Sequence, residues 1–141
     1  MNTDNPGFVL ADVARLLRRT FRQRLAGVEL SFEQARALMV IAHCEGIRQV
    51  DLAERLDVQP ITLVHQIDQL AASGLVERRT DPADRRAYQL FLTRAAAPHL
   101  AAIGKIGAKV QADMLRGLSK EQVALMLAGL HAMRENLTPR P

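Results

Sequence analysis

Apolar side chains recur every three or four residues near both ends of the chain. The stripe near the N-terminus consists of Leu10, Val13, Leu17, Phe21 and Leu25. The stripe near the C-terminus consists of Val123, Met126, Leu127, Leu130, Met133 and Leu137. Residues at this spacing share one face of an α-helix, so we predict an amphipathic helix at each end. The first helix is expected to begin at Asp4 or Asn5, before Pro6, and to end at Gly27.

Two capping boxes mark further helix starts. Ser31 and Gln34 are spaced so that the hydroxyl and the amide side chain can each bond the other residue's backbone N–H. This pair predicts a second helix that continues to about His43. Ser119 and Gln122 repeat the spacing and predict the start of the C-terminal helix.

Two short helices are predicted in the middle of the chain. The first covers residues 50–56, and residues 57–59 form the turn that follows. Pro60 opens the next helix at its first position, where its missing N–H costs nothing. Gly74 ends this helix. Its predicted buried face consists of Leu63, Ile67 and Leu70.

A β-hairpin is predicted directly after these helices. Residues 75–79 and 87–92 are the strand candidates. Residues 81–84, Asp-Pro-Ala-Asp, have proline at the second position, as a β-turn favours. Arg85 and Arg86 follow that turn.

A long fifth helix is expected after the hairpin. Thr93 is the predicted N-cap of this helix, and Gly117 is its predicted end. Pro98 removes one backbone hydrogen bond, so we expect a bend there.

This order of elements predicts a mainly α (α+β) fold, a winged helix-turn-helix with long terminal helices and a small hairpin wing. Residues 1–30 are the expected N-terminal dimerisation helix, and residues 31–93 the expected DNA-binding lobe. Residues 94–141 are the expected C-terminal dimerisation helices. All three belong to one structural domain, which 141 residues can form with a proper core.

The chain has more basic than acidic residues. The net charge is +4, and 16 of the 19 basic residues are arginine, whose planar guanidinium suits phosphates and base edges. A high-GC coding bias would also raise arginine, so this ratio alone is weak evidence. Five arginines crowd the first helix, either as an ordinary solvated face or as a charge that steers DNA toward the protein: Arg15, Arg18, Arg19, Arg22 and Arg24.

Composition also indicates where the protein works. A single cysteine, Cys44, excludes an internal disulfide and a cysteine-based zinc cluster, and it agrees with the cytoplasm. The first residues lack the pattern of a secretory signal, and no apolar run has membrane-spanning length. We therefore expect a cytoplasmic protein with no membrane partner.

The apolar terminal helices predict a partner subunit. The central helix-turn-helix is too small to cover both of them, so a homodimer with interleaved terminal helices is the economical solution. A monomer with a helical core is the alternative.

Several motifs together resemble the MarR family of bacterial transcriptional regulators. These are Leu-Ser-Phe-Glu-Gln at 30–34, Asp-Leu-Ala-Glu-Arg-Leu at 51–56, Gly-Leu-Val-Glu-Arg at 74–78, Asp-Pro-Ala-Asp-Arg-Arg at 81–86 and Leu-Thr at 92–93. The resemblance runs from about Leu10 to Leu137, and residues 74–93 are its most specific part. It implies a homodimer that binds a pseudo-palindromic promoter site. It also implies a repressor that is released by a small aromatic or phenolic effector.

The resemblance places the fourth helix in the DNA major groove. The candidate contacts of this helix are Pro60, Thr62, His65, Gln66 and Gln69. Threonine can contact a phosphate or a thymine methyl, and glutamine can bond adenine bidentately. The helix holds no lysine or arginine, and Asp68 makes its charge −1. We therefore expect affinity to come from elsewhere.

The wing is the expected source of that affinity. By resemblance Arg86 enters the minor groove, where a narrow A·T-rich groove attracts arginine. Arg85 is assigned to a phosphate. Asp84 is expected to orient Arg86, or to tie the wing to Arg78 or Arg79. The alternative is that Arg85 and Arg86 are ordinary exposed charges in a hairpin.

No metal site or cofactor is predicted. His43 and Cys44 are sequence neighbours that point in different directions, and His65, His99 and His131 show no zinc spacing. Peroxide sensors of the resembled family place their cysteine near the first helix, unlike Cys44. Effector-binding residues are not identified, although Arg15 or His43 could bind a carboxylate.

Enzyme motifs are missing from the sequence. It contains no nucleophile elbow, no phosphate-binding glycine loop and no recognisable pair of catalytic carboxylates, so we predict that the protein is not an enzyme. The competing function is a winged-helix protein–protein interaction module, such as an anti-activator, without a tight DNA site.

Overall fold

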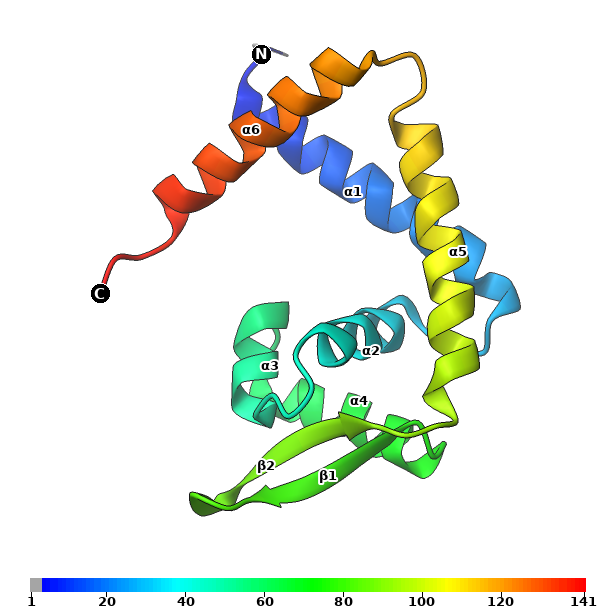
Figure 1. The fold of residues 1–141 in the computed structure, drawn as a ribbon, viewed down its shortest axis with the longest axis vertical. Coiled ribbons are helices and arrows are strands. Elements are labelled where there is room, and N and C mark those ends of the chain that lie inside the picture. Colours follow the sequence, from blue (N-terminus) through cyan, green and yellow to red (C-terminus); the bar gives the residue numbers. More distant parts are fainter. Residues whose placement is uncertain (1–3) are drawn as a thin grey trace.

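The computed structural model describes residues 4–141, and it consists of a compact lobe from which three long helices extend (Figure 1). The elements are α1 (Pro6–Arg24), a 3-10 turn η1 (Leu25–Gly27), α2 (Phe32–His43), α3 (Gln49–Leu56), α4 (Pro60–Ala72), β1 (Val76–Asp81), β2 (Asp84–Leu92), α5 (Ala96–Met114) and α6 (Lys120–Leu137). This architecture confirms the predicted winged helix-turn-helix with long terminal helices.

The lobe contains α2, α3, α4 and the hairpin. Its core is a cluster of fully buried aliphatic side chains that the amphipathic pattern of each element brings together. The largest are Leu38, Ile41, Leu52, Leu63, Ile67, Leu70 and Leu90. The predicted buried face of α4 is therefore confirmed. Between α3 and α4, Asp57 adopts a left-handed φ of 52°, which aspartate tolerates, and this residue makes the tight turn.

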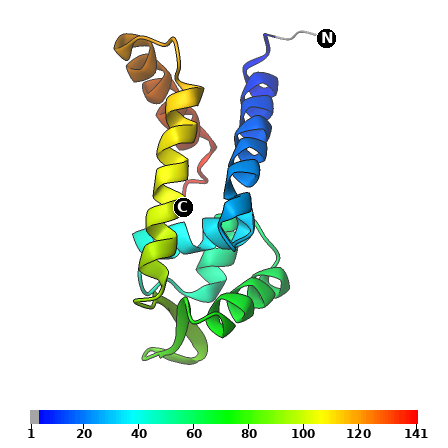
Figure 2. The same cartoon turned by 90° about the vertical axis from the view of Figure 1, so that its right-hand side faces the viewer.

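The terminal helices form a separate frame. Helices α1 and α5 lie side by side above the lobe, and α6 leaves the far end of α5 at an angle (Figures 1 and 2). Neither α1 nor α6 has a single buried residue. Both predicted capping boxes are present, and Asn5 is the N-cap of α1. No helix within residues 4–141 is both long and apolar enough to cross a membrane.

The hairpin is longer than predicted. Its strands reach Asp81 and Asp84, so the turn contains only Pro82 and Ala83, and Arg85 and Arg86 belong to β2. The pairing is antiparallel from Val76 with Leu92 to Thr80 with Tyr88, and the register shifts before Asp81. The prediction ended the strands too early because proline and aspartate at 81–84 are typical turn residues and interrupt the alternating strand pattern.

One prediction about α5 was wrong, and the reason given for a second one does not apply. Thr93 does not cap it, because the Thr93 hydroxyl donates to the carbonyl of Gly74 and the helix begins at Ala96. Pro98 is then the third residue of α5, within the first turn, where no intrahelical N–H bond is lost. The reason to expect a bend at Pro98 therefore disappears.

Candidate nucleic-acid interface

Helix α4 presents a short polar face beside the wing. Pro60, Thr62 and His65 are exposed, whereas Gln66 is half-buried. Gln69 is exposed, but its side-chain oxygen accepts a hydrogen bond from Nε2 of Gln34, with 3.1 Å between the atoms. This bond uses one of the two acceptor sites on the Gln69 oxygen and links the side chain to α2, so contact with adenine would share this oxygen or replace the bond.

Arg78 joins the base of the wing to α4. Its guanidinium lies 2.7 Å from a carboxylate oxygen of Asp68 and donates to the carbonyl of Val64 at 3.3 Å. It also donates from Nε to Gln49 of α3 at 2.9 Å. Arg78 thus neutralises the acidic residue of α4. Sequence reasoning missed this contact, and the only signal for it was an arginine within the first strand.

The wing arginines project from β2. Arg85 and Arg86 are exposed, and their guanidinium groups have no partner within residues 4–141. Asp84 accepts a hydrogen bond from the backbone N–H of Arg86 at 3.0 Å. The expected tie between Asp84 and Arg78 or Arg79 is wrong, because other partners occupy both arginines. Arg79 pairs with Glu77 at 3.3 Å and stacks over the Phe91 ring at 4.0 Å.

A buried aspartate holds the tip of the wing. Asp81 is only 5% exposed. Its carboxylate accepts one bond from the Ala83 backbone N–H at 2.8 Å and another from Arg48 Nε at 2.6 Å. The Ala83 amide and the Arg48 guanidinium together lower the pKa of Asp81 below its ordinary value of 3.8, although burial opposes them. Asp81 belongs to the predicted turn, but its partner Arg48 was not anticipated.

The lowered pKa of Asp81 predicts how acid affects stability. The ionised carboxylate is favoured in the folded state, so its contribution is present above the unfolded pKa near 3.8 and is lost as the pH falls through the folded value. We expect Asp81→Asn to lower the melting temperature at pH 7. The difference between the two proteins should shrink as the pH falls below 3.8, because protonated aspartate and asparagine are both neutral. A constant difference in calorimetric melting temperature between pH 7 and pH 3 would contradict this assignment.

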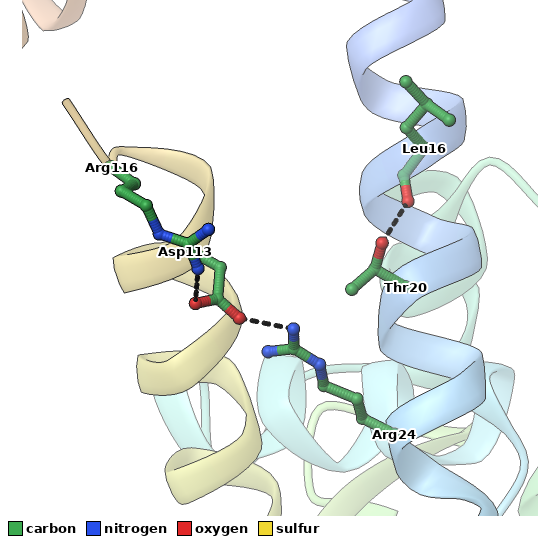
Figure 3. A network of polar contacts seen from close by, with 5 residues as sticks. All are labelled: Leu16, Thr20, Arg24, Asp113 and Arg116. Carbon is green, nitrogen blue, oxygen red and sulfur yellow. Dashed lines mark hydrogen bonds and ion pairs between the residues drawn. The ribbon is translucent and has the colours of Figure 1, made fainter. Parts of the chain in front are cut away.

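The arginines of α1 differ in their partners. Arg15 pairs with Asp12 at 2.7 Å, and Arg22 pairs with Glu33 at 2.8 Å. Arg24 pairs across the helices with Asp113 of α5, which also holds Arg116 (Figure 3). Arg24 is the first cause of a lowered pKa for Asp113. Three of the five arginines of α1 are therefore engaged in ion pairs and are not a free basic surface.

Two cavities flank α1. One, of about 320 Å³, lies between α1 and α5 above the Arg24–Asp113 pair, and its apolar walls include Val13, Leu16 and Met114. The other, of about 200 Å³, lies between α1 and α2. Its lining is mostly apolar and includes two arginines: Leu17, Arg18, Phe21, Phe32, Ala35, Arg36 and Met39. The second cavity combines apolar walls with cationic donors.

The other candidates have local partners. Nδ1 of His43 lies 2.8 Å from the carbonyl oxygen of Met39, and Arg55 donates to the sulfur of Cys44 at 2.9 Å. Neither Arg15 nor His43 lines either cavity beside α1. Residues 4–141 contain no cluster of three metal-binding side chains.

Comparison with known proteins agrees with this geometry. Residues 30–88 match the model of the MarR family. A crystal structure of MarR is 26% identical, with a TM-score of 0.84 over 96% of this chain and 93% of that one. The S. aureus MepR–DNA complex is 21% identical, with a TM-score of 0.80 over 98% and 100%. The transcriptional repressor CouR, bound to a 23-mer DNA duplex, is 24% identical, with a TM-score of 0.81 over 94% of each chain.

Proposed function

We propose that the chain is a transcriptional regulator of the MarR family, that it binds a pseudo-palindromic promoter site as a homodimer and that it represses transcription. Regulators of this family are not enzymes, in agreement with the sequence. The observation that carries the proposal is the pair of unpartnered arginines, Arg85 and Arg86, beside the exposed face of α4. The DNA held by MepR and by CouR in similar structures supports it.

The proposed contacts divide between the two grooves. Helix α4 lies in the major groove, where Thr62, His65 and Gln66 meet base edges or phosphates. Gln69 takes part with a side chain that Gln34 already holds by one hydrogen bond. Pro60 sits at the N-terminal end of α4, close to the DNA backbone. In the wing, Arg86 enters the minor groove, Arg85 meets a phosphate, and Asp84 orients Arg86 through its backbone N–H.

The charges of α4 and of the wing favour this division. Helix α4 has no basic residue of its own, and the bond between Arg78 and Asp68 removes its only negative charge from competition with DNA phosphates. The recognition helix is thus neutral, and the exposed wing supplies the cations. We expect affinity to depend mainly on the wing and base preference mainly on α4.

The proposed homodimer accounts for the uncovered helices. Large apolar side chains of α1 and α6 are at least one-third exposed, among them Phe8, Leu10, Val13, Leu16, Leu125 and Leu137. Contiguous apolar surface of this kind marks an interface. A second copy that interleaves its own α1, α5 and α6 would cover it and would place two wings on one palindrome.

Selection of operators from a random DNA pool tests the function directly. Enrichment of a pseudo-palindrome, with binding that falls steeply as salt rises, supports the regulator. If the pool yields no enriched sequence and a lysate partner binds the lobe instead, the protein-interaction module becomes the better description. The neutral charge of α4 is the observation that favours this second function.

A small aromatic acid is the proposed effector, and the cavity between α1 and α2 is its proposed site. Arg18 lines this cavity, and its guanidinium can form charge-assisted hydrogen bonds with a carboxylate above the apolar floor. We expect Arg18→Ala to weaken benzoate binding by about tenfold or more in calorimetric titrations. Arg15→Ala is the matched control, since Arg15 pairs with Asp12 and does not line the cavity. Equal effects of the two variants would exclude this site.

A further inference from the structure

The segment between α2 and α3 pairs with β2 of the wing through backbone hydrogen bonds and an isolated β-bridge. Gly46 donates its N–H to the carbonyl of Leu90, and Leu90 donates to the carbonyl of Ile47, both at 2.9 Å. Arg48 then forms a β-bridge with Gln89. The wing is therefore paired along one edge with the segment that enters α3, although the two lie more than 40 residues apart in the sequence.

Two side chains of this segment hold the wing at its opposite ends. At the base, Glu45 accepts a hydrogen bond from the backbone N–H of Leu92 at 2.9 Å. At the tip, Arg48 donates to the buried carboxylate of Asp81 at 2.6 Å. Hairpins of two strands are only marginally stable alone, so these outside contacts matter for the order of the wing.

The contacts at the tip lead directly to the exposed arginines. Asp81 holds the backbone N–H of Ala83 and pairs in the sheet with Asp84, at the point where the hairpin register shifts. Asp84 in turn holds the backbone N–H of Arg86. Arg48 is thus connected to Arg86 through three contacts. These are the Arg48–Asp81 hydrogen bond, the strand pairing of Asp81 with Asp84 and the hydrogen bond from the Arg86 backbone to Asp84.

We propose that Arg48 and Asp81 are positioning residues for the minor-groove contact: they fix the backbone of the wing tip so that Arg86 is already aimed before DNA arrives. This inference rests on the proposed function. We call the Arg48–Asp81 ion pair, together with the hydrogen bond from Ala83 to Asp81, the lock. An ordered wing loses less conformational entropy on binding than a mobile one, so the lock increases affinity for DNA without contacting DNA itself. Arg48 is 41% exposed, and its role is assigned through Asp81 rather than through a phosphate.

Asp81→Asn distinguishes positioning from simple electrostatics by the sign of its effect. The change removes one negative charge from the wing, so charge alone predicts tighter binding to DNA. Loss of the lock predicts weaker binding. We expect the dissociation constant for the selected operator, measured by fluorescence anisotropy at fixed salt, to rise by about five- to thirtyfold.

Glu77→Gln is the matched control. It removes the same charge from the same hairpin, but Glu77 is exposed and pairs with Arg79, away from the tip. We expect this variant to bind DNA as tightly as the wild type or more tightly. Equal or tighter binding by Asp81→Asn as well would overturn the proposal.

A double-mutant cycle with Arg86→Ala tests the path itself. If the lock acts through Arg86, Asp81→Asn and Arg48→Ala should each change affinity less than about twofold once Arg86 is replaced. Fully additive effects would mean that Arg48 contacts DNA itself or that the lock serves another purpose. Circular dichroism and sedimentation of each variant check that the fold and the oligomeric state are retained.

A measurement without DNA separates this proposal from the proposed function. Amide hydrogen exchange at Ala83 and Arg86 should be at least about tenfold faster in Asp81→Asn than in the wild type, whereas exchange in α4 should be unchanged. If operator selection fails but exchange at the tip accelerates, the lock exists and the DNA function is wrong. If amide exchange at the wing tip does not change in Asp81→Asn, the lock is refuted, whatever the DNA-binding measurements show.

Discussion

Replacing Arg86 with alanine is expected to weaken operator binding by roughly 1–3 kcal/mol, or about 5- to 150-fold. Arg86 is exposed in β2, and its guanidinium has no partner within residues 4–141, so no internal ion pair must break before it enters the groove. A narrow minor groove concentrates negative potential and attracts such a group. Gel-shift titration at fixed salt measures the effect, and melting temperature confirms that the variant is folded.

Two further arginine variants make this result specific. Arg85→Ala should also weaken binding, but as a loss of one phosphate contact it should reduce the salt slope by about one. Arg116→Ala removes the same charge at the far end of α5, where Arg116 pairs with Asp113, and should leave affinity unchanged (Figure 3). An affinity of Arg86→Ala equal to that of the wild type would exclude the minor-groove assignment.

Replacing Leu16 with glutamate is expected to dissociate the proposed homodimer into monomers. Leu16 is 46% exposed and lines the apolar wall of the cavity between α1 and α5, on the face that a second copy would cover. Burying an unpaired carboxylate there costs several kcal/mol, so the dimer dissociation constant should rise by about 100-fold or more. Sedimentation velocity across a concentration series measures this shift.

Val50→Glu is the control for the Leu16 variant. Val50 is 63% exposed on α3 and lies in the lobe rather than on the terminal helices, so this change should leave the oligomeric state intact. Monomeric Leu16→Glu should also lose the palindrome preference, because a single lobe reads one half-site. A wild-type chain that is monomeric at micromolar concentration would contradict the homodimer, and an unaltered dimer in Leu16→Glu would exclude this face.

Signals between near neighbours in the sequence predicted the elements well. Capping boxes at Ser31 and Ser119, proline at the first position of α4 and glycine after its end all act within a few residues. The expectation for Thr93 failed because its hydroxyl bonds Gly74, which lies 19 residues earlier and becomes a neighbour only when the hairpin folds. The helix-capping preference of threonine is a local property, so it cannot indicate that a distant carbonyl will take the hydroxyl group.

The candidate site was only partly visible in the sequence. The wing motif identified Arg85, Arg86 and Asp84, and the structure places these residues together at one end of the hairpin. It did not identify Arg48 or the bond of Arg78 to Asp68, since an ion pair leaves no periodic pattern. Nor did it indicate that Gln34 donates a hydrogen bond to the side-chain oxygen of Gln69.

The sequence by itself determined the order of the elements, most of their caps, the buried face of α4 and the resemblance to the MarR family over residues 30–88. These properties follow from hydrogen bonds and apolar spacing within one or two helical turns. Only the tertiary structure decided which charges remain free. Arg78 and Arg48 are engaged by Asp68 and Asp81, whereas Arg85 and Arg86 are not. The reason is that pairing depends on distance in space, and folding brings residues 33 positions apart to within 2.6 Å.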